Sequence, residues 1–359
     1  MQYNKENPYI LGKLPPNIDF ESSKLKDALL RARVALAELK GYSFSMPNPF
    51  LLLSPAVLRE SLASSEIENI HTTIVEVLQN QLFPEKEQRK PDKEVLRYKD
   101  AVVWGYENLD KYSISTRLIL GIQKKLVHAS HGEYRKQQNA IVNHLTKERI
   151  YTPPVARDVP ELMGNLENFI NNPDDGIDPL IKAAIAHYQF EAIHPFGDGN
   201  GRTGRILMVL FLIMTEVLKW PILYISGYIN KNRTEYYRLL NDISANGSWE
   251  EFILFMLDGF YFQAKETNKV LFEIMSLFDN YKTSIKQDLK SIYSADLVEQ
   301  IFSFPIITPA KLGKALDIHY VTAGKYLTKL SQAGFVKEQK YGKYRLFINQ
   351  KLISIIEGE

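Results

Sequence analysis

The chain has 359 residues, of which 45% are apolar and 24% charged, and these values are typical of folded globular proteins with two or three domains. The absence of cysteine excludes disulfides, a thiol nucleophile and cysteine-ligated zinc, and it predicts a reducing, cytoplasmic location. The first ten residues lack a basic start followed by an apolar run, and the longest apolar stretch, Ile206–Met214, is too short to span a bilayer. We therefore expect no signal peptide and no membrane partner.

The net charge of +2 is unevenly distributed along the chain. Residues 305–359 contain nine Lys and Arg against four Asp and Glu, whereas residues 1–304 contain 35 against 38. A basic C-terminal segment after a mildly acidic remainder indicates a separate module with an anionic partner. Surface lysines that only interact with water would also explain this charge.

Helical periodicity dominates the first 290 residues, after a proline-rich arm. The predicted helices cover residues 22–39, 54–69, 92–108, 115–127, 159–171, 180–192 and a stretch that begins just past Gly201 and ends before Pro221. Residues 139–150, followed by Tyr151-Thr-Pro-Pro, predict a short extended hairpin. The body is therefore expected to be mainly α-helical.

The helix predicted over residues 54–69 carries its own boundary signals. Ser54 can cap its N-terminus and Pro55 is suited to its first turn. We expect Glu60 and Glu66 on its outer surface.

The pattern changes from about Tyr293. Thr308-Pro309 predicts a short helix to Leu316, and a second helix is predicted over residues 320–332, ending at Gly334. Two short strands, 335–339 and 344–348, then flank a Lys-Tyr-Gly-Lys turn. Two helices followed by a hairpin is the order of a winged helix-turn-helix.

The most informative segment is His194-Pro-Phe-Gly-Asp-Gly-Asn-Gly-Arg-Thr-Gly-Arg205, which joins two predicted helices. Its glycines allow backbone N–H groups to face one point and a ligand to approach closely. The helix that follows adds free N–H groups and the positive end of its dipole. The segment therefore predicts a site for phosphate oxygens.

Four side chains in this segment extend that interpretation. Arg202 and Arg205 are three residues apart, on one face of the first helical turn, and guanidinium suits phosphate. Asp198 offers the oxygen ligand that Mg²⁺ uses beside phosphates, and His194 can accept a proton near neutral pH. Each feature alone is commonly structural, but together they favour phosphoryl-transfer chemistry.

This segment resembles the signature of the Fic family, His-Pro-Phe-x-Asp/Glu-Gly-Asn-Gly-Arg-x-x-Arg, and matches every fixed position. The resemblance implies a Fic-type helical core and transfer of AMP from ATP, with Mg²⁺ or Mn²⁺, to a Ser, Thr or Tyr hydroxyl of a target protein. It implies that His194 is the base and Asp198 the metal ligand. The residues that it assigns to ATP are Gly199, Asn200 and Gly201 as the anion hole, Arg202 and Arg205 on the β- and γ-phosphates, and the intervening Thr203 and Gly204.

Two further stretches resemble the family outside the signature. Residues 139–143 match its flap, which holds the target in an extended, main-chain-paired mode, with Ile141 and Val142 as the expected contacts. Tyr237 and Leu240 resemble the border of the adenine site, a pattern that packing alone would also explain. His187, seven residues before His194, is expected to be a buried hydrogen-bonding residue and not a metal ligand.

Residues Ser64-Ser-Glu-Ile-Glu68-Asn69 resemble the family's inhibitory pattern, Ser/Thr-x-x-x-Glu-Gly/Asn. A Glu68 carboxylate placed against Arg205 would occupy the guanidinium that the γ-phosphate needs. The same Glu68 could instead position water to remove AMP from a modified target. Both roles remain open at this stage.

These features predict a helical region over residues 1–110 that includes the inhibitory helix, a catalytic core over 111–270, a linker helix over 271–292 and a winged helix-turn-helix over 293–359. The basic residues within 305–351 fit DNA contacts or a protein or dimerisation partner. The alternatives to adenylyl transfer are removal of AMP, transfer of another nucleotide, and a nucleotide-sensing DNA-binding regulator. Self-modification and a homodimer are compatible with the sequence.

Overall fold

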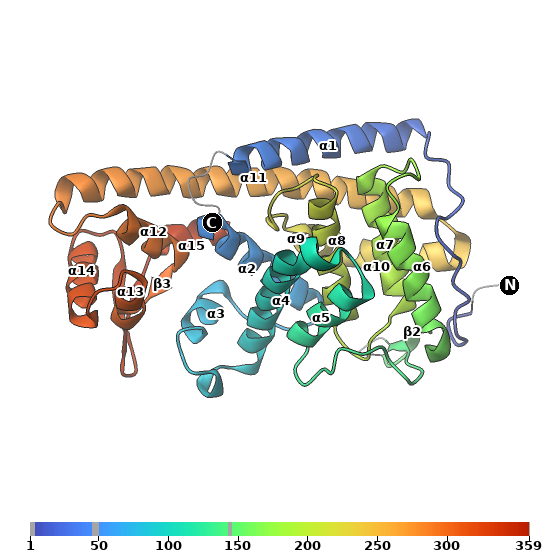
Figure 1. Cartoon of the computed structure of the whole chain (residues 1–359), viewed down its shortest axis with the longest axis horizontal. Coiled ribbons are helices and arrows are strands. Elements are labelled where there is room, and N and C mark those ends of the chain that lie inside the picture. Colours follow the sequence, from blue (N-terminus) through green and yellow to red (C-terminus); the bar gives the residue numbers. More distant parts are fainter. Residues whose placement is uncertain (1–3, 45–49, 143–145, 359) are drawn as a thin grey trace.

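The structure is a computed structural model that describes residues 4–44, 50–142 and 146–358 (Figure 1). It confirms a mainly α-helical protein with two small antiparallel sheets. The helices are α1 (Ser23–Phe44), α2 (Phe50–Ile67), α3 (Ile74–Asn80), α4 (Lys90–Tyr112), α5 (Thr116–Leu126), α6 (Val159–Asn171), α7 (Pro179–Ile193), α8 (Asn200–Met214), α9 (Ile225–Lys231), α10 (Arg233–Asn246), α11 (Trp249–Asp288), α12 (Ala295–Ser303), α13 (Pro309–Ala315), α14 (Tyr320–Gln332) and α15 (Gln350–Glu357). The strands are β1 (Ile141–Val142), β2 (Arg149–Tyr151), β3 (Ile306–Ile307), β4 (Lys337–Tyr341) and β5 (Tyr344–Ile348).

The long helix α11 runs along the whole length of the molecule, and α1 lies beside it (Figure 1). Its buried positions recur at helical spacing through its 40 residues, so one apolar stripe serves both the helical body and the C-terminal unit. The division predicted at residues 270 and 271 falls inside this helix.

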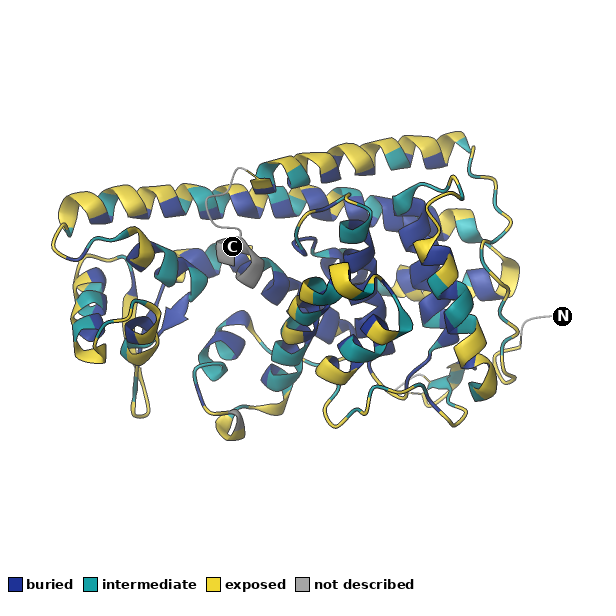
Figure 2. Cartoon of the chain, viewed as in Figure 1, coloured by how far each residue is buried: buried dark blue, intermediate teal, exposed yellow. Residues whose placement is uncertain are grey.

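Helices α7 and α8 form the centre of the body. Every residue of α7 from Leu180 to Phe190 is buried, and α8 is buried from Arg202 to Leu212 (Figure 2). A helix that is buried on all sides must be enclosed by other elements, and here α4, α5, α6 and α11 pack around the pair. The loop between α7 and α8 is therefore held by two rigid elements.

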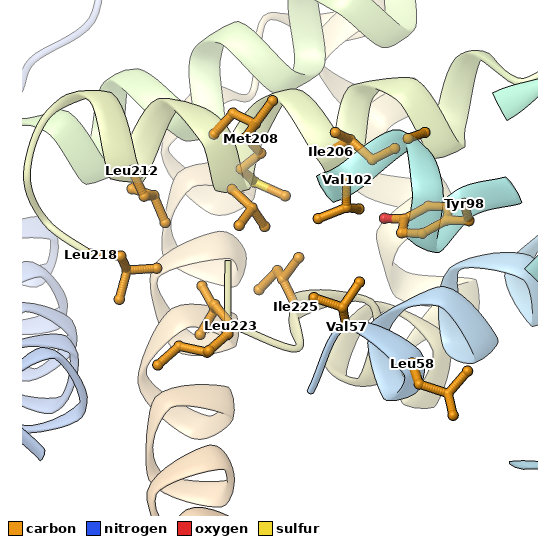
Figure 3. Packing of buried hydrophobic residues seen from close by; sticks show 14 of the residues in the cluster. Val57, Leu58, Tyr98, Val102, Ile206, Met208, Leu212, Leu218, Leu223 and Ile225 are labelled. Atoms are coloured by element: carbon orange, nitrogen blue, oxygen red, sulfur yellow. The ribbon is translucent and has the colours of Figure 1, made fainter. Parts of the chain in front are cut away.

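Helix α2 packs against α4, α8 and α9, with Val57 facing the region around Val102 and Ile206 (Figure 3). It begins at Phe50, not at the predicted Ser54, and Pro55 lies inside it. The run Phe50-Leu-Leu-Leu contains three leucines, which favour helix, so the helix extends past the expected cap.

The prediction that Glu60 lies on the outer surface of α2 is wrong. Its side chain is buried at 4% exposure and accepts hydrogen bonds from Tyr98 Oη at 3.0 Å, the Ser226 backbone N–H at 2.9 Å and the Ser226 hydroxyl. Helix α2 is covered on this side by α4 and α9, whose donors satisfy the buried carboxylate.

The C-terminal unit has the predicted order of helix, helix and hairpin. Strand β5 lies between β3 and β4, and both pairings are antiparallel. The unit contacts the body through α12 and α15, which pack against α2, and through Tyr341 and Tyr344, whose rings lie 5.3 and 4.9 Å from that of Phe83. The hairpin therefore packs on the segment that follows α3.

Within the described ranges, none of the helices combines the length and the apolar character that crossing a membrane requires.

Candidate active site

The loop between α7 and α8 depends on two residues with left-handed backbone conformations. His194 ends α7 with φ 49° and ψ 58°, and Gly199 precedes α8 with φ 76°. A Cβ at Gly199 would lie 2.7 Å from Val127 Cγ2, so a side chain here would also collide. Because Gly199 has no side chain to cap α8, the first N–H groups of the helix receive no cap from it.

The Asn200 side chain holds the loop in shape. Its Oδ1 accepts from the Phe196 backbone N–H at 2.8 Å, and its Nδ2 donates to the Phe196 carbonyl at 2.9 Å. These two bonds close the loop on itself, and the Asn200 backbone N–H lies in the first turn of α8.

Arg205 is buried at 1% exposure and makes its polar contacts with the predicted inhibitory segment. Its Nε donates to Ser64 Oγ at 2.8 Å, and its Nη2 donates to the Ser64 carbonyl and to Glu68 Oε1, both at 3.0 Å. A Cβ on Gly201 would lie 2.4 Å from Glu68 Oε1, so this ion pair needs a glycine beneath it. Asn69, the last residue of the pattern, accepts from the Arg233 guanidinium at 3.2 Å.

The charges of Glu68 and Arg205 stabilise each other. Burial alone would raise the pKa of Glu68, but the charge and hydrogen bond of Arg205, with smaller effects of Arg202 and His194, lower that pKa below its ordinary value. Glu68 is therefore ionised at neutral pH.

Arg202 has a different partner from Arg205. It is buried at 3% exposure, and its Nη1 donates to Glu94 Oε2 on α4 at 2.9 Å. Its Nε has no hydrogen-bond partner within the described residues. Both arginines of the signature are thus paired with carboxylates from the N-terminal helices.

His194 has the environment of a neutral base. Its Nδ1 lies 3.4 Å from the Glu191 carbonyl oxygen, which fits a tautomer protonated at Nδ1 with Nε2 free to accept a proton. Burial lowers the pKa of His194 to about 4, and Arg135 adds to that effect, whereas the Glu191 carbonyl, Glu68 and Asp198 oppose it. The imidazole is therefore uncharged at neutral pH.

A pocket of about 590 Å³ brings most of the predicted residues together. It is bordered by the inhibitory segment, the flap, the end of α7, the start of α8 and helix α10. The predicted residues that line it are Glu68, Asn69, Ile141, Val142, His194, Gly201, Arg205, Tyr237 and Leu240. The predicted residues outside its lining are Ser64, Asp198, Gly199, Asn200, Arg202, Thr203 and Gly204.

Besides Gly199, Asn200 and Arg202, whose contacts are described above, four predicted residues lie outside the lining of the pocket. Thr203 and Gly204 are buried on the core side of α8, where a Cβ on Gly204 would lie 2.4 Å from Glu191 Oε1. Ser64 lies behind Arg205. Asp198 is 71% exposed beside the pocket and accepts from the Gly199 N–H at 2.7 Å.

The chemistry of Asp198 fits a magnesium ion that arrives with a nucleotide. Mg²⁺ commonly uses one or two carboxylates and completes its coordination with phosphate oxygens and water. The described residues contain no cluster of three or more His, Asp or Glu that would hold a metal alone. One exposed carboxylate beside a phosphate site is consistent with that arrangement.

The flap and helix α10 form the outer walls. Strands β1 and β2 pair antiparallel, as predicted, and Val142 is 39% exposed. On α10, Tyr237 is 45% exposed, while Tyr236 is buried and its hydroxyl lies 2.7 Å from His187 Nε2. The prediction that His187 is a buried hydrogen-bonding residue is confirmed.

Sequence reasoning missed three charged residues of this region. Glu94 accepts a hydrogen bond from Arg202. Glu191 lines the pocket, and burial is the main cause that raises its pKa to about 7. Arg135 donates to the His194 carbonyl at 3.0 Å. Glu191 precedes the signature by three residues on the same helix, a spacing that gives some signal. Glu94 and Arg135 lie far away in the chain and give none.

Three family profiles match the chain. The profile described as Fic/DOC family matches residues 113–212, the Fic/DOC family N-terminal profile matches residues 26–107, and the profile of the protein adenylyltransferase SoFic-like C-terminal domain matches residues 277–352. The first two together cover about half of the chain.

Relatives and solved structures agree with these profiles. The protein adenylyltransferase Fic of Drosophila mojavensis and that of Drosophila melanogaster are each 33% identical over 128 residues, or 35% of this chain and 23% of theirs. The chain thus aligns with about a quarter of the length of these curated relatives. A Fic family protein from Desulfovibrio desulfuricans has a similar fold, with a TM-score of 0.58 at 21% identity over 93% of this chain and 98% of that one. Fic-1 from C. elegans has a TM-score of 0.53 at 19% identity over 69% and 74%.

Proposed function

The chain belongs to the Fic/DOC family, and on this premise we propose that it is a protein adenylyltransferase, which transfers AMP from ATP to a Ser, Thr or Tyr hydroxyl of a target protein. The observation that supports this proposal best is the pocket in which His194, the start of α8 at Gly201 and Arg205 border one space. A base, a helix N-terminus and a guanidinium there meet the needs of a triphosphate and an attacking hydroxyl.

The proposed reaction gives each of these groups a role. His194 Nε2 takes the proton of the target hydroxyl, whose oxygen forms a bond to the α-phosphorus of ATP. The bond from that phosphorus to the bridging oxygen breaks, and pyrophosphate leaves. The N–H groups at the start of α8 stabilise the negative charge on the phosphate oxygens, and Arg205 receives the γ-phosphate once it is released from Glu68.

Asp198 is the residue that would hold Mg²⁺ or Mn²⁺. When bound, the ion would neutralise negative charge on the phosphates. Its exposed carboxylate, four residues after His194, is close enough in sequence to serve the same nucleotide.

We further propose that Glu68 inhibits the enzyme. Its bond to Arg205 occupies the guanidinium that the γ-phosphate needs, and Ser64 accepts hydrogen bonds from Nε and Nη2 of the same guanidinium. ATP bound in this state would be misplaced, and an error of about 1 Å can lower a rate on the order of 100-fold.

The test is a transfer assay with labelled ATP, GTP, UTP and CTP, in which the Glu68→Gly variant acts on host lysate and on itself. Labelling of protein by ATP above the other nucleotides supports adenylyl transfer, and labelling by another nucleotide changes the donor. Release of AMP from a modified target by the wild type, and not by the Glu68→Gly variant, would favour the reverse reaction, in which Glu68 positions water. Binding of nucleotide without transfer would favour a sensing regulator, a role that would not need His194.

The C-terminal unit is a candidate winged helix-turn-helix with a DNA or protein partner. Lys325 and Lys329 on α14 and every residue of β4 are exposed, and this favours contact with an anionic partner. A gel-shift assay with duplex DNA at low and raised salt tests DNA binding, and light scattering tests the homodimer. A cytoplasmic location stays a prediction from the cysteine-free sequence.

A further inference from the structure

Residues 135–151, which include the flap, are hydrogen-bonded to five consecutive residues, 192–196, at the end of α7 and in the loop that follows it. The carbonyl oxygens of residues 192–196 each accept a hydrogen bond from a donor located between residues 135 and 151. The donors are Tyr151 Oη to Ala192, Arg135 Nη2 to Ile193, Arg135 Nε to His194, the Arg135 backbone N–H to Pro195 and Asn139 Nδ2 to Phe196, at 2.8 to 3.5 Å. Three of the five bonds come from Arg135.

The guanidinium of Arg135 also joins the two ends of the flap to each other. Nη1 donates to the Gln137 carbonyl at 3.2 Å, before β1, and Nη2 donates to the Pro154 carbonyl, after β2. One side chain therefore contacts the base-bearing residue and both sides of the element that is expected to hold the target.

The chemistry of these contacts is unusual for an arginine. Arg135 is 9% exposed, and each of its hydrogen-bond acceptors within the described residues is a backbone carbonyl. A buried cation without a carboxylate is costly unless other acceptors compensate it. Here the free carbonyls and the negative dipole end of α7 provide that compensation.

His194 needs such support. His194 has φ 49°, and a non-glycine residue in this left-handed region is strained and persists only when its surroundings hold it there. The bond from Arg135 Nε to the His194 carbonyl holds the peptide that follows this residue, and thereby the direction in which the imidazole leaves the backbone.

We propose that Arg135 is a positioning residue that fixes the His194 imidazole and the flap relative to each other, so that a hydroxyl presented on the flap meets the base. This inference rests on the proposed adenylyl transfer for its kinetic consequence, while the coupling of flap and loop is a property of the chain itself. Lysine cannot replace arginine here, because one ammonium group does not reproduce a planar fork that contacts four carbonyls.

The experiment compares Arg135→Lys and Arg135→Gln in the Glu68→Gly background, with Arg157→Gln as control, because Arg157 is 87% exposed and follows the flap in the chain. Three quantities are measured: kcat for transfer to protein, the affinity for ATP, and hydrogen exchange by mass spectrometry. We expect kcat to fall about 10- to 100-fold for both Arg135 variants while ATP affinity stays unchanged within about twofold. Exchange should rise in both 137–154 and 192–199, with α8 and the part of α7 before Ala192 unaffected, and the control should match its parent.

Several results would overturn the proposal. If Arg135→Lys has the kcat of its parent, the planar guanidinium is not needed for positioning. This variant alone tests the proposal if Arg135→Gln does not fold. A fall in ATP affinity parallel to kcat, or a rise in exchange throughout the chain, would assign Arg135 a purely structural role. If the Glu68→Gly parent itself transfers no AMP, the proposed function fails, and hydrogen exchange alone decides whether Arg135 couples the two segments.

Discussion

The Nη2 atom of Arg205 lies 3.0 Å from Oε1 of Glu68, across the first turn of α8 and directly above Gly201. The two side chains differ in exposure, since Arg205 is enclosed while 36% of the Glu68 side chain is accessible. In the proposed inhibited state, the γ-phosphate would therefore compete with the more accessible Glu68 carboxylate for an enclosed guanidinium. We accordingly expect Glu68, and not Arg205, to move when ATP binds.

Replacing Glu68 by Gly should raise AMP transfer on the order of 100-fold, because Arg205 becomes available to the γ-phosphate. The measurement is incorporation of labelled AMP into protein at fixed ATP. Glu66→Gly is the matched control, since Glu66 lies two residues before Glu68 in the same segment and accepts a hydrogen bond from Asn230 instead of Arg205. Equal labelling by wild type and Glu68→Gly would show that the ion pair does not inhibit.

Replacing His194 by Ala should abolish transfer even in the Glu68→Gly variant. A general base contributes about 10²–10⁴-fold, and the loop around His194 is held by backbone bonds that an alanine leaves in place. ATP binding, measured by calorimetry, should persist because it depends on α8 and Arg205. Transfer by His194→Ala within about tenfold of its parent would assign the base to another group.

The pH dependence of kcat/KM should lack the rise near pH 6.5 that an ordinary histidine gives. Burial lowers the pKa of His194 to about 4, so the imidazole is neutral and competent above that value and is lost as base only when the pH falls towards it. Because the Glu68 carboxylate raises this pKa, the Glu68→Gly variant should keep its activity to still lower pH. The expected profile for that variant is flat from about pH 5 to pH 8, and an acid limb centred at 6.5 would contradict it.

Replacing Glu60 by Ala should destabilise the protein by about 3 kcal/mol, because the donors of Tyr98 and Ser226 would remain buried without an acceptor. Urea unfolding followed by circular dichroism measures the change in the free energy of unfolding. Glu66→Ala on the same helix should change it by no more than about 0.5 kcal/mol. A Glu60→Ala variant as stable as this control would mean that water satisfies those donors.

Much of the fold is accessible from local sequence signals. Helices α6 and α14 have the predicted bounds, since Val159-Pro160 at the start of one and Gly334 after the other are strong boundary signals. Residues 194–205 are equally informative, because twelve consecutive residues contain the loop, the helix start and the polar groups of the site.

The remaining features depend on contacts between distant segments. The sequence of α2 alone favours an exposed position for the charged Glu60. The donors that satisfy its buried carboxylate come from residues 98 and 226, on other helices. Arg135 is separated from the His194 carbonyl by 59 residues, and Glu94 from Arg202 by 108. Neither propensity nor periodicity specifies which of many surface charges will meet in space.

The most direct test of the account is a crystal structure of the Glu68→Gly variant with a non-hydrolysable ATP analogue and Mg²⁺. We predict that the triphosphate lies over the start of α8, with the γ-phosphate on Arg205, the ion on Asp198 and the α-phosphorus facing the His194 imidazole. An analogue bound elsewhere, or an imidazole turned away from the α-phosphorus, would contradict the assignment of this site.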